Sequence, residues 1–269
     1  MRSENTGKNI IKAIKVYKDH VTLSFAKREK LQISKEAYLS SYLYVGKNIS
    51  NQEIEKLNEI TSLSSLLKYA TSLLNKRRYS ERKLYEKLTI KEDDKKSVKA
   101  VINKLKEMTL LDDQAYMNDL IIYYDERNMG KNKVIKRLRE KGIPESLIQE
   151  AKFSSSSELK KAQLLIPKLE KKYDKYAYEN KKKHIYASLI AQGFEIDVAR
   201  QVLEDVKKGQ PKKEKEILLK DYQKIKGRYK KKYDGYELKQ KIYVALANKG
   251  YRHSEIKKVL EEDFYENDY

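Results

Sequence analysis

The sequence predicts a mostly α-helical protein, with tandem three-helix repeats in an elongated array preceded by a small N-terminal antiparallel β module. Three observations lead to this fold class. Apolar residues recur at helical spacing over most of the chain, one helix–glycine–helix plan occurs three times, and residues 10–33 alternate apolar and polar side chains as strands do. The first two features favour a repeat architecture rather than one large globular domain.

The composition also favours thin, layered units. Of the 269 residues, only 39% are hydrophobic while 37% are charged. A single compact domain of this length needs long apolar segments at its centre, whereas stacked small units are nearly all surface and tolerate many charges. We therefore expect a series of small cores along the chain.

The N-terminal stretch has the period of β-strands. Val21, Leu23 and Phe25 alternate with polar residues, and shorter apolar alternations lie on either side, at 14–16 and 31–33. Short polar breaks between these runs suit hairpin loops, which predicts a three-stranded antiparallel sheet. Because such a sheet is marginal alone, we expect a helix over 35–44 to cover its apolar face.

Helical signals begin at residue 50. Ser50 with Glu53 forms the pattern of a capping box, so a helix is predicted to start there. Leucines at steps of three and four residues then form one apolar stripe that predicts a helix ending near Lys76.

Two further helices are predicted after a basic interruption at 77–79. Ser80 is placed to cap a short helix, and the next helix ends before Thr109. A third helix then begins, for which either Asp112 or Asp113 is the expected N-cap, since a carboxylate there also favours the helix N-terminus.

One plan recurs in the segments KVIKRLREKGIPESLIQEA, HIYASLIAQGFEIDVARQVL and KIYVALANKGYRHSEIKKVL. In each, a glycine follows a leucine by four residues and precedes an apolar residue and a second helix. We expect Gly142, Gly193 and Gly250 to adopt the left-handed conformation that ends a helix. The apolar residues behind them should fold back onto that helix; they are Ile143, Phe194 and Tyr251.

A degenerate copy of this plan precedes the three clear ones, which makes four units. Each is completed by a longer helix, expected at 113–129, 158–178 and 212–233 in the last three, and polar linkers are expected at 154–157 and 207–213. The predicted division is a β module with covering helices at 1–60, followed by helical repeats at 61–110, 111–153, 154–208 and 209–269.

The chain is strongly basic. Lysine and arginine number 60 against 40 acidic residues, for a net charge of +20, and the excess is shared almost evenly among the segments 1–60, 61–151, 152–210 and 211–269. A body that is positive along its whole length suits a long polyanion, such as single- or double-stranded DNA or a nucleoprotein filament. The alternative is a solvated lysine-rich surface without a specific partner.

Two basic clusters are the candidate binding sites for such a partner. One surrounds the cap at Ser80 and the other follows Arg127; their alternative interpretation is a pair of solvated helix ends. The candidate residues are Arg77, Arg78, Arg82 and Lys83 in the first, and Arg127, Lys131, Lys133, Lys136, Arg137 and Arg139 in the second.

Other motifs favour structural roles. The lysine runs at 181–183 and 230–232 adjoin tyrosines that could stack on bases, but tyrosines at helical spacing are more often packing residues. The pair Asp112 and Asp113 could resemble a nuclease site, yet nothing completes one. The three histidines lie far apart in sequence, so no metal, cofactor or catalytic site is expected. Without cysteine, a signal-like N-terminus or a long apolar run, the chain is expected to be cytoplasmic and not membrane-bound.

Three segments carry a resemblance to a known family. The tract LLNKRRYSERKLYEKL at 73–88, LLDDQAYMNDLI at 110–121 and REKGI at 139–143 resemble the RecX regulatory proteins, and the opening strands resemble the extension of longer members. The resemblance implies a monomer without enzymatic activity that binds RecA filaments on DNA. It would modulate, mainly inhibit, recombinase, ATPase and coprotease activities in DNA repair, recombination and the SOS response. The alternative function is a basic repeat protein that binds DNA directly, without a recombinase partner.

Overall fold

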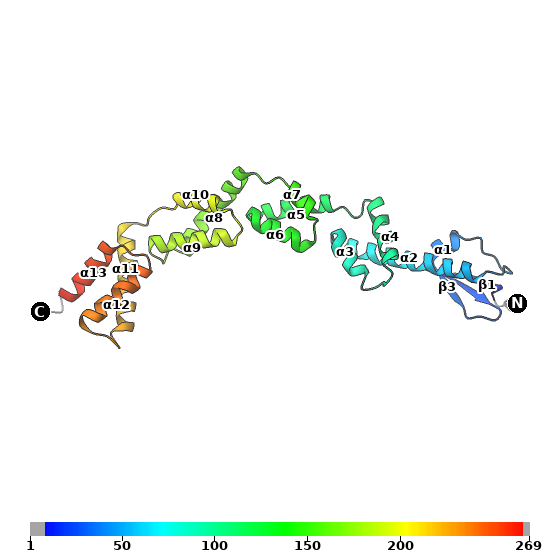
Figure 1. Ribbon diagram of the computed structural model, residues 1–269, viewed down its shortest axis with the longest axis horizontal. Helices are drawn as coiled ribbons and strands as arrows, with labels where there is room; N and C mark the ends of the chain where they lie inside the picture. Colours follow the sequence, from blue (N-terminus) through cyan, green and yellow to red (C-terminus); the bar gives the residue numbers. More distant parts are fainter. Residues whose placement is uncertain (1–8, 266–269) are drawn as a thin grey trace. The chain divides into compact units, whose positions relative to one another are not determined.

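The computed structural model describes residues 9–265 and confirms the mostly helical fold with a small N-terminal sheet (Figure 1). The chain divides into two compact units, Met1–Asn118 with Glu140–Glu145, and Asp119–Arg139 with Ser146–Tyr269. Along the chain the elements are β1 (Ile11–Val16), β2 (Val21–Phe25), β3 (Leu31–Ile33), α1 (Lys35–Leu39), α2 (Asn51–Lys76), α3 (Glu81–Leu88), α4 (Lys95–Glu107), α5 (Asp113–Asp125), α6 (Lys131–Lys141), α7 (Glu145–Glu150), α8 (Ser155–Lys172), α9 (Tyr178–Ala191), α10 (Ile196–Glu204), α11 (Pro211–Tyr229), α12 (Gly235–Asn248) and α13 (His253–Tyr265).

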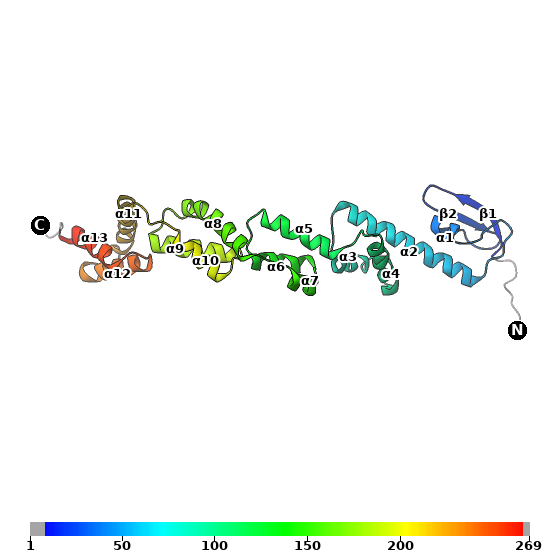
Figure 2. The same ribbon diagram turned by 90° about the horizontal axis from the view of Figure 1, so that it is seen from above.

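The N-terminal sheet is antiparallel in the order β1-β2-β3, with Val16 opposite Val21 across the first hairpin. Its apolar face forms a core with α1 and the beginning of α2, which lie beside it (Figure 2). The covering helix is shorter than predicted: α1 ends at Leu39, where the Ser40 side chain bonds the backbone of the last turn. Tyr42 is 86% exposed. The rest of the cover comes from α2, whose first turns bury two apolar side chains in the same core.

Helix α2 is a single helix of 26 residues that serves two cores. Ser50 and Glu53 form the predicted capping box at its start. Its N-terminal half packs on the sheet through Ile54 and Leu57, and its C-terminal half packs on α3 and α4 through Leu66. The unit boundary predicted at residue 60 therefore falls inside a continuous helix.

The helix–glycine–helix plan is confirmed at each of its three occurrences. Gly142, Gly193 and Gly250 have φ values of +84°, +88° and +85°, in the left-handed region. The residues that follow them, Ile143, Phe194 and Tyr251, are buried. Helices α8–α10 surround one apolar core and α11–α13 surround another, as expected of repeats that each bury a small set of side chains.

Some predicted linkers and helix ends differ from the structure. Ser155–Ser157 belong to the first turn of α8 rather than to a linker, because the Ser154 carbonyl accepts the first helical hydrogen bond, from the Glu158 backbone N–H, at 3.0 Å. The longer helices also end earlier than predicted, at Asp125, Lys172 and Tyr229. Within residues 9–265, no helix is both long and apolar enough to cross a membrane.

Candidate partner-binding surface

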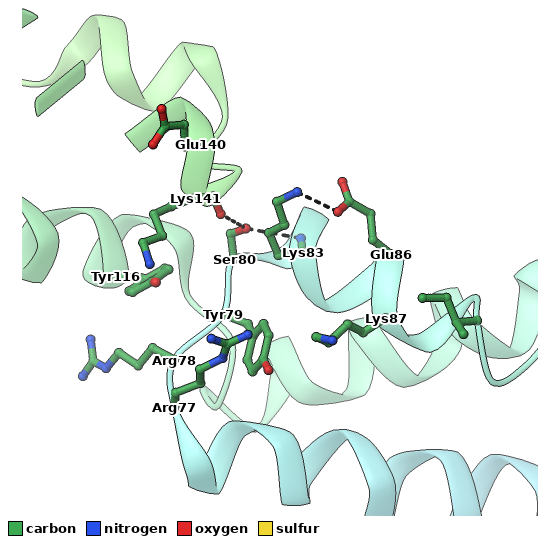
Figure 3. Close-up of a pocket in the computed structure, with 11 residues that line it drawn as sticks. Arg77, Arg78, Tyr79, Ser80, Lys83, Glu86, Lys87, Tyr116, Glu140 and Lys141 are labelled. Carbon is green, nitrogen blue, oxygen red and sulfur yellow. Dashed lines mark hydrogen bonds and ion pairs between the residues drawn. The ribbon is translucent and has the colours of Figure 1, made fainter. Parts of the chain in front are cut away.

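The first basic cluster is held together by the junction between α2 and α3. Helix α2 ends at Lys76, and the extended backbone of Arg77 begins a short connector to the cap at Ser80. The Arg77 guanidinium lies over the Tyr79 ring, with its carbon 4.6 Å from the ring centroid (Figure 3). Arg82 and Lys83 follow in the first turn of α3, and both pair with Glu86, at 3.6 Å and 2.8 Å. The structure thus brings all four predicted residues to one end of α3.

Ser80 also fastens this end of α3 to the end of α6. Its hydroxyl accepts a hydrogen bond from the Lys83 backbone N–H at 3.3 Å, as predicted for the cap, and donates one to the Lys141 carbonyl at 2.7 Å. Gly142 lies against the same point, since a Cβ there would sit 2.7 Å from the Ser80 Oγ. The glycine turn of one repeat therefore packs against the first turn of a helix in the repeat before it.

The two aspartates at the start of α5 have different roles. Asp112 caps α5 itself, by accepting a hydrogen bond from the Ala115 N–H at 2.9 Å. Asp113 accepts one from the Glu81 N–H at 2.8 Å and so caps α3. Burial raises the pKa of the Asp113 carboxyl. Both carboxylates are engaged by backbone donors, which favours the capping interpretation over a nuclease pair.

A cleft of about 510 Å³ opens beside the first cluster, within the first unit (Figure 3). Of the predicted residues, Arg77, Arg78 and Lys83 line it, whereas Arg82 lies outside the lining. The sequence interpretation missed the other contributors from α3 and from the following repeat: Lys87, Ile90, Tyr116 and Lys141. Lys87 could have been found from its i+4 spacing to Lys83 on α3, but nothing in the sequence pattern indicated that Tyr116 and Lys141 face the same space.

The second basic cluster surrounds the start of α6, in the second unit. Arg127 stacks on the Tyr123 ring at 3.5 Å, and its guanidinium donates to the Tyr123 carbonyl at 3.0 Å. Lys131 pairs with Glu195 at 2.8 Å, and Lys133 donates to the Gln192 side chain at 2.7 Å. These two lysines therefore hold α6 to the next glycine turn. The exposed remainder of the cluster is Lys136, Arg137 and Arg139.

The start of α6 is built like the start of α3. The Gly130 N–H donates to the Gln192 carbonyl at 2.9 Å, and the Asn132 N–H donates to the Gly193 carbonyl at 2.9 Å. The Lys131 N–H donates to the carboxylate of Glu158, which stands in the first turn of α8 as Asp113 does in α5. Arg127, Lys133 and Arg137 occupy the positions around α6 that Arg77, Lys83 and Lys87 occupy around α3. The two clusters are thus copies of one repeat feature.

The remaining candidate groups are mostly packing residues. Lys181, in one of the lysine runs, is buried and pairs with Glu170 at 3.6 Å. His184 stacks on the Tyr173 ring, with centroids 5.2 Å apart, and the Tyr251 hydroxyl donates to Asp221 at 2.8 Å. In the described part of the chain, no three His, Cys, Asp or Glu side chains gather as metal ligands would.

These features define a class: a tandem three-helix repeat protein whose repeats interlock through glycine turns and carry basic side chains beside the joints. Comparison with known proteins finds similar proteins in one family. Residues 213–260, within the last predicted repeat, match the model described as "RecX, third three-helix domain". Regulatory protein RecX of Streptococcus gordonii is 29% identical, over 88% of this chain and 92% of its own. That of Streptococcus agalactiae is 27% identical, over 90% and 94%.

A solved structure agrees in fold. A crystal structure of regulatory protein RecX aligns with a TM-score of 0.62 over 74% of this chain and 99% of its own, at 19% identity. At that identity the likeness speaks for the fold alone. The family model and the curated relatives, which span nearly the whole chain, make this chain similar to the RecX regulatory proteins along most of its length.

Proposed function

We propose that the protein binds RecA filaments on DNA and lowers their recombinase, ATPase and coprotease activities, acting as a cytoplasmic monomer without chemistry of its own. Similarity to the RecX regulatory proteins over most of the chain carries the proposal. The repeated basic clusters at the starts of α3 and α6 support it, because a filament presents many copies of each acidic surface to successive repeats. Binding would therefore be distributed over several modest contacts.

The direct test is a titration of the purified protein against the cognate recombinase assembled on single-stranded DNA. The DNA-dependent ATPase rate is measured at low and at physiological salt. We expect the rate to fall at or below one protein per recombinase protomer, because a bound repeat array alters filament growth or disassembly. An unchanged rate even at low salt would contradict the proposal.

Charge reversal tests the first basic cluster. In Arg77→Glu/Arg78→Glu/Arg82→Glu we expect inhibition of the ATPase to weaken by about tenfold. Each lost contact to an acidic surface costs from a few tenths of a kcal/mol to about 1 kcal/mol, and three such contacts are lost. The matched control reverses three exposed lysines on α4: Lys95, Lys96 and Lys99. Circular dichroism should show equal helicity in both variants. Equal inhibition by both would place the partner surface elsewhere.

The second candidate function is direct DNA binding without a recombinase, which is favoured by the even spread of basic residues. It predicts an affinity for bare DNA that falls steeply with salt and is the same with or without recombinase. Measuring DNA binding over a salt series, with the recombinase added or omitted, separates the two candidates.

A further inference from the structure

The cleft beside α3 combines basic and apolar side chains in one concave space. It is lined by five basic side chains and two acidic ones. One of the acids, Glu86, is already paired with Arg82 and Lys83 on its own helix. Lys87 and Lys141 have no ion-pair partner among the described residues. The cleft therefore presents unmatched positive charge to whatever enters it.

Apolar surface lies next to this charge. Ile90, just beyond the end of α3, is 85% exposed, and the rings of Tyr79 and Tyr116 form further walls. Arg77 covers the Tyr79 ring, and Lys141 and Tyr116 line the same cleft, so cations and apolar groups share its walls (Figure 3). The exposed isoleucine holds apolar surface in contact with water, which is unfavourable. An apolar group of a ligand that packed on Ile90 would remove that surface from water and so favour binding.

We propose that this cleft binds an acidic peptide segment of a protein partner, with an apolar side chain against Ile90 and carboxylates on Lys87 and Lys141. The inference rests on the proposed function only in the choice of partner, that is, in which protein carries this segment. A volume of about 510 Å³ accommodates a few residues.

A nucleic acid backbone fits the cleft less well than such a peptide. A phosphodiester chain offers no apolar group to Ile90, which lines the cleft beside its cations. Phosphate tracks also favour open rows of cations along an extended groove, whereas these cations converge on a concavity from the α2–α3 connector, from α3 and from the end of α6. The carboxylate and apolar groups of a peptide match both parts of the lining.

Binding is measured by fluorescence anisotropy on the full chain. The probe is a short fluorescein-labelled peptide of glutamates interrupted by leucines, and oligothymidine is a competing probe. We expect the peptide to bind wild type and Lys87→Gln/Lys141→Gln to weaken it about tenfold, by removing both unpaired cations. Ile90→Ser, which changes no charge, should weaken it about fivefold. The matched control Lys95→Gln/Lys99→Gln, on exposed positions of α4, should bind as wild type does.

Several results would overturn the proposal. These are absence of peptide binding, equal losses in the cleft and control variants, and an Ile90→Ser variant that binds normally. Loss of oligothymidine binding in Lys87→Gln/Lys141→Gln without any peptide binding would make the cleft a phosphate site instead. The ATPase titration keeps the two proposals apart. If the peptide binds but the filament ATPase is unaffected, the cleft proposal holds and the proposed function is refuted. If the filament is inhibited but no peptide binds, the proposed function holds and the cleft proposal is refuted.

Discussion

Two glycines, Gly142 and Gly193, each perform two tasks at the joints between repeats. Gly193 ends α9 in a left-handed conformation, with φ +88°, and a Cβ at this position would overlap the backbone of Lys133 at the start of α6. The same double constraint holds at Gly142, which packs on Ser80. A glycine is therefore needed for the close approach as well as for the turn.

Gly193→Ala should lower the free energy of unfolding of the second unit by about 2 kcal/mol or more, from backbone strain and the displaced α6. The control is Gly227→Ala, inside α11, where a Cβ would meet nothing within 4 Å. That substitution should be neutral or stabilise by up to about 1 kcal/mol, because alanine favours the helix. Urea unfolding followed by circular dichroism measures both. Equal midpoints for the two variants would show that the joint has no role.

Glu158 is a buried carboxyl at the same joint. Its side chain is 2% exposed, accepts from the Lys131 N–H, and leaves Oε2 without a hydrogen bond among the described residues. Burial is the main cause that raises its pKa; Glu195 adds to the rise, while the Lys131 bond and Lys161 oppose it. The folded protein thus binds this proton more tightly than the unfolded chain does.

It follows that the contribution of Glu158 to stability is largest at low pH, where the carboxyl is protonated in both states, and falls as the pH rises through its folded pKa. Glu158→Gln keeps an acceptor without the charge, so it should gain stability relative to wild type between about pH 4 and pH 7. Glu158→Ala should lose about 1–3 kcal/mol, because the Lys131 N–H loses its acceptor. Thermal unfolding over this pH range tests both variants. A difference between wild type and Glu158→Gln that does not vary with pH would refute the argument.

At the scale of elements, the start of α3 shows how one repeat supports the next. Its N-terminal N–H groups are satisfied from within by Ser80 and from the following repeat by Asp113. The N-cap hydroxyl also bonds Lys141, so a local helix signal doubles as a contact between repeats. Losing it should cost more than losing an ordinary cap.

Ser80→Ala should therefore destabilise the first unit by about 2–3 kcal/mol, the sum of a lost cap and a lost buried hydrogen bond. Ser50→Ala is the comparison, because Ser50 caps α2 but bonds only its own capping box; it should cost about 1 kcal/mol. Chemical denaturation of both variants gives the two values. A smaller loss in Ser80→Ala than in Ser50→Ala would mean that the bond to Lys141 contributes nothing.

For the whole molecule, the positive charge is spread over all segments, so no single repeat should carry the entire interaction. Helices α11–α13 have a core of their own. Removing residues 209–269 should leave the earlier repeats folded and weaken inhibition of the recombinase ATPase on the order of tenfold, because the remaining contacts still act together. The ATPase titration compares the two chains. Complete loss of inhibition, with the remaining helices intact, would place the partner site in the last repeat.

The sequence by itself determined the elements of this protein. The alternation at 21–25, the cap at Ser80 and the glycines at 142, 193 and 250 are local signals, and local hydrogen bonds and steric limits act on neighbouring residues alone. The basic clusters were visible for the same reason, as runs in the chain. Even the helix ends that were misplaced, such as the start of α8, differ by only a few residues.

Only the tertiary structure decided which of those signals meet. That Asp113 caps α3 rather than α5, that Lys133 faces Gln192, and that Tyr116 and Lys141 close a cleft with Arg77 all depend on contacts between residues far apart in the chain. Such contacts are fixed by the packing of one repeat on the next, which no periodicity records. The physical reason is that helix signals are local, whereas a binding surface depends on the positions of several helices at once.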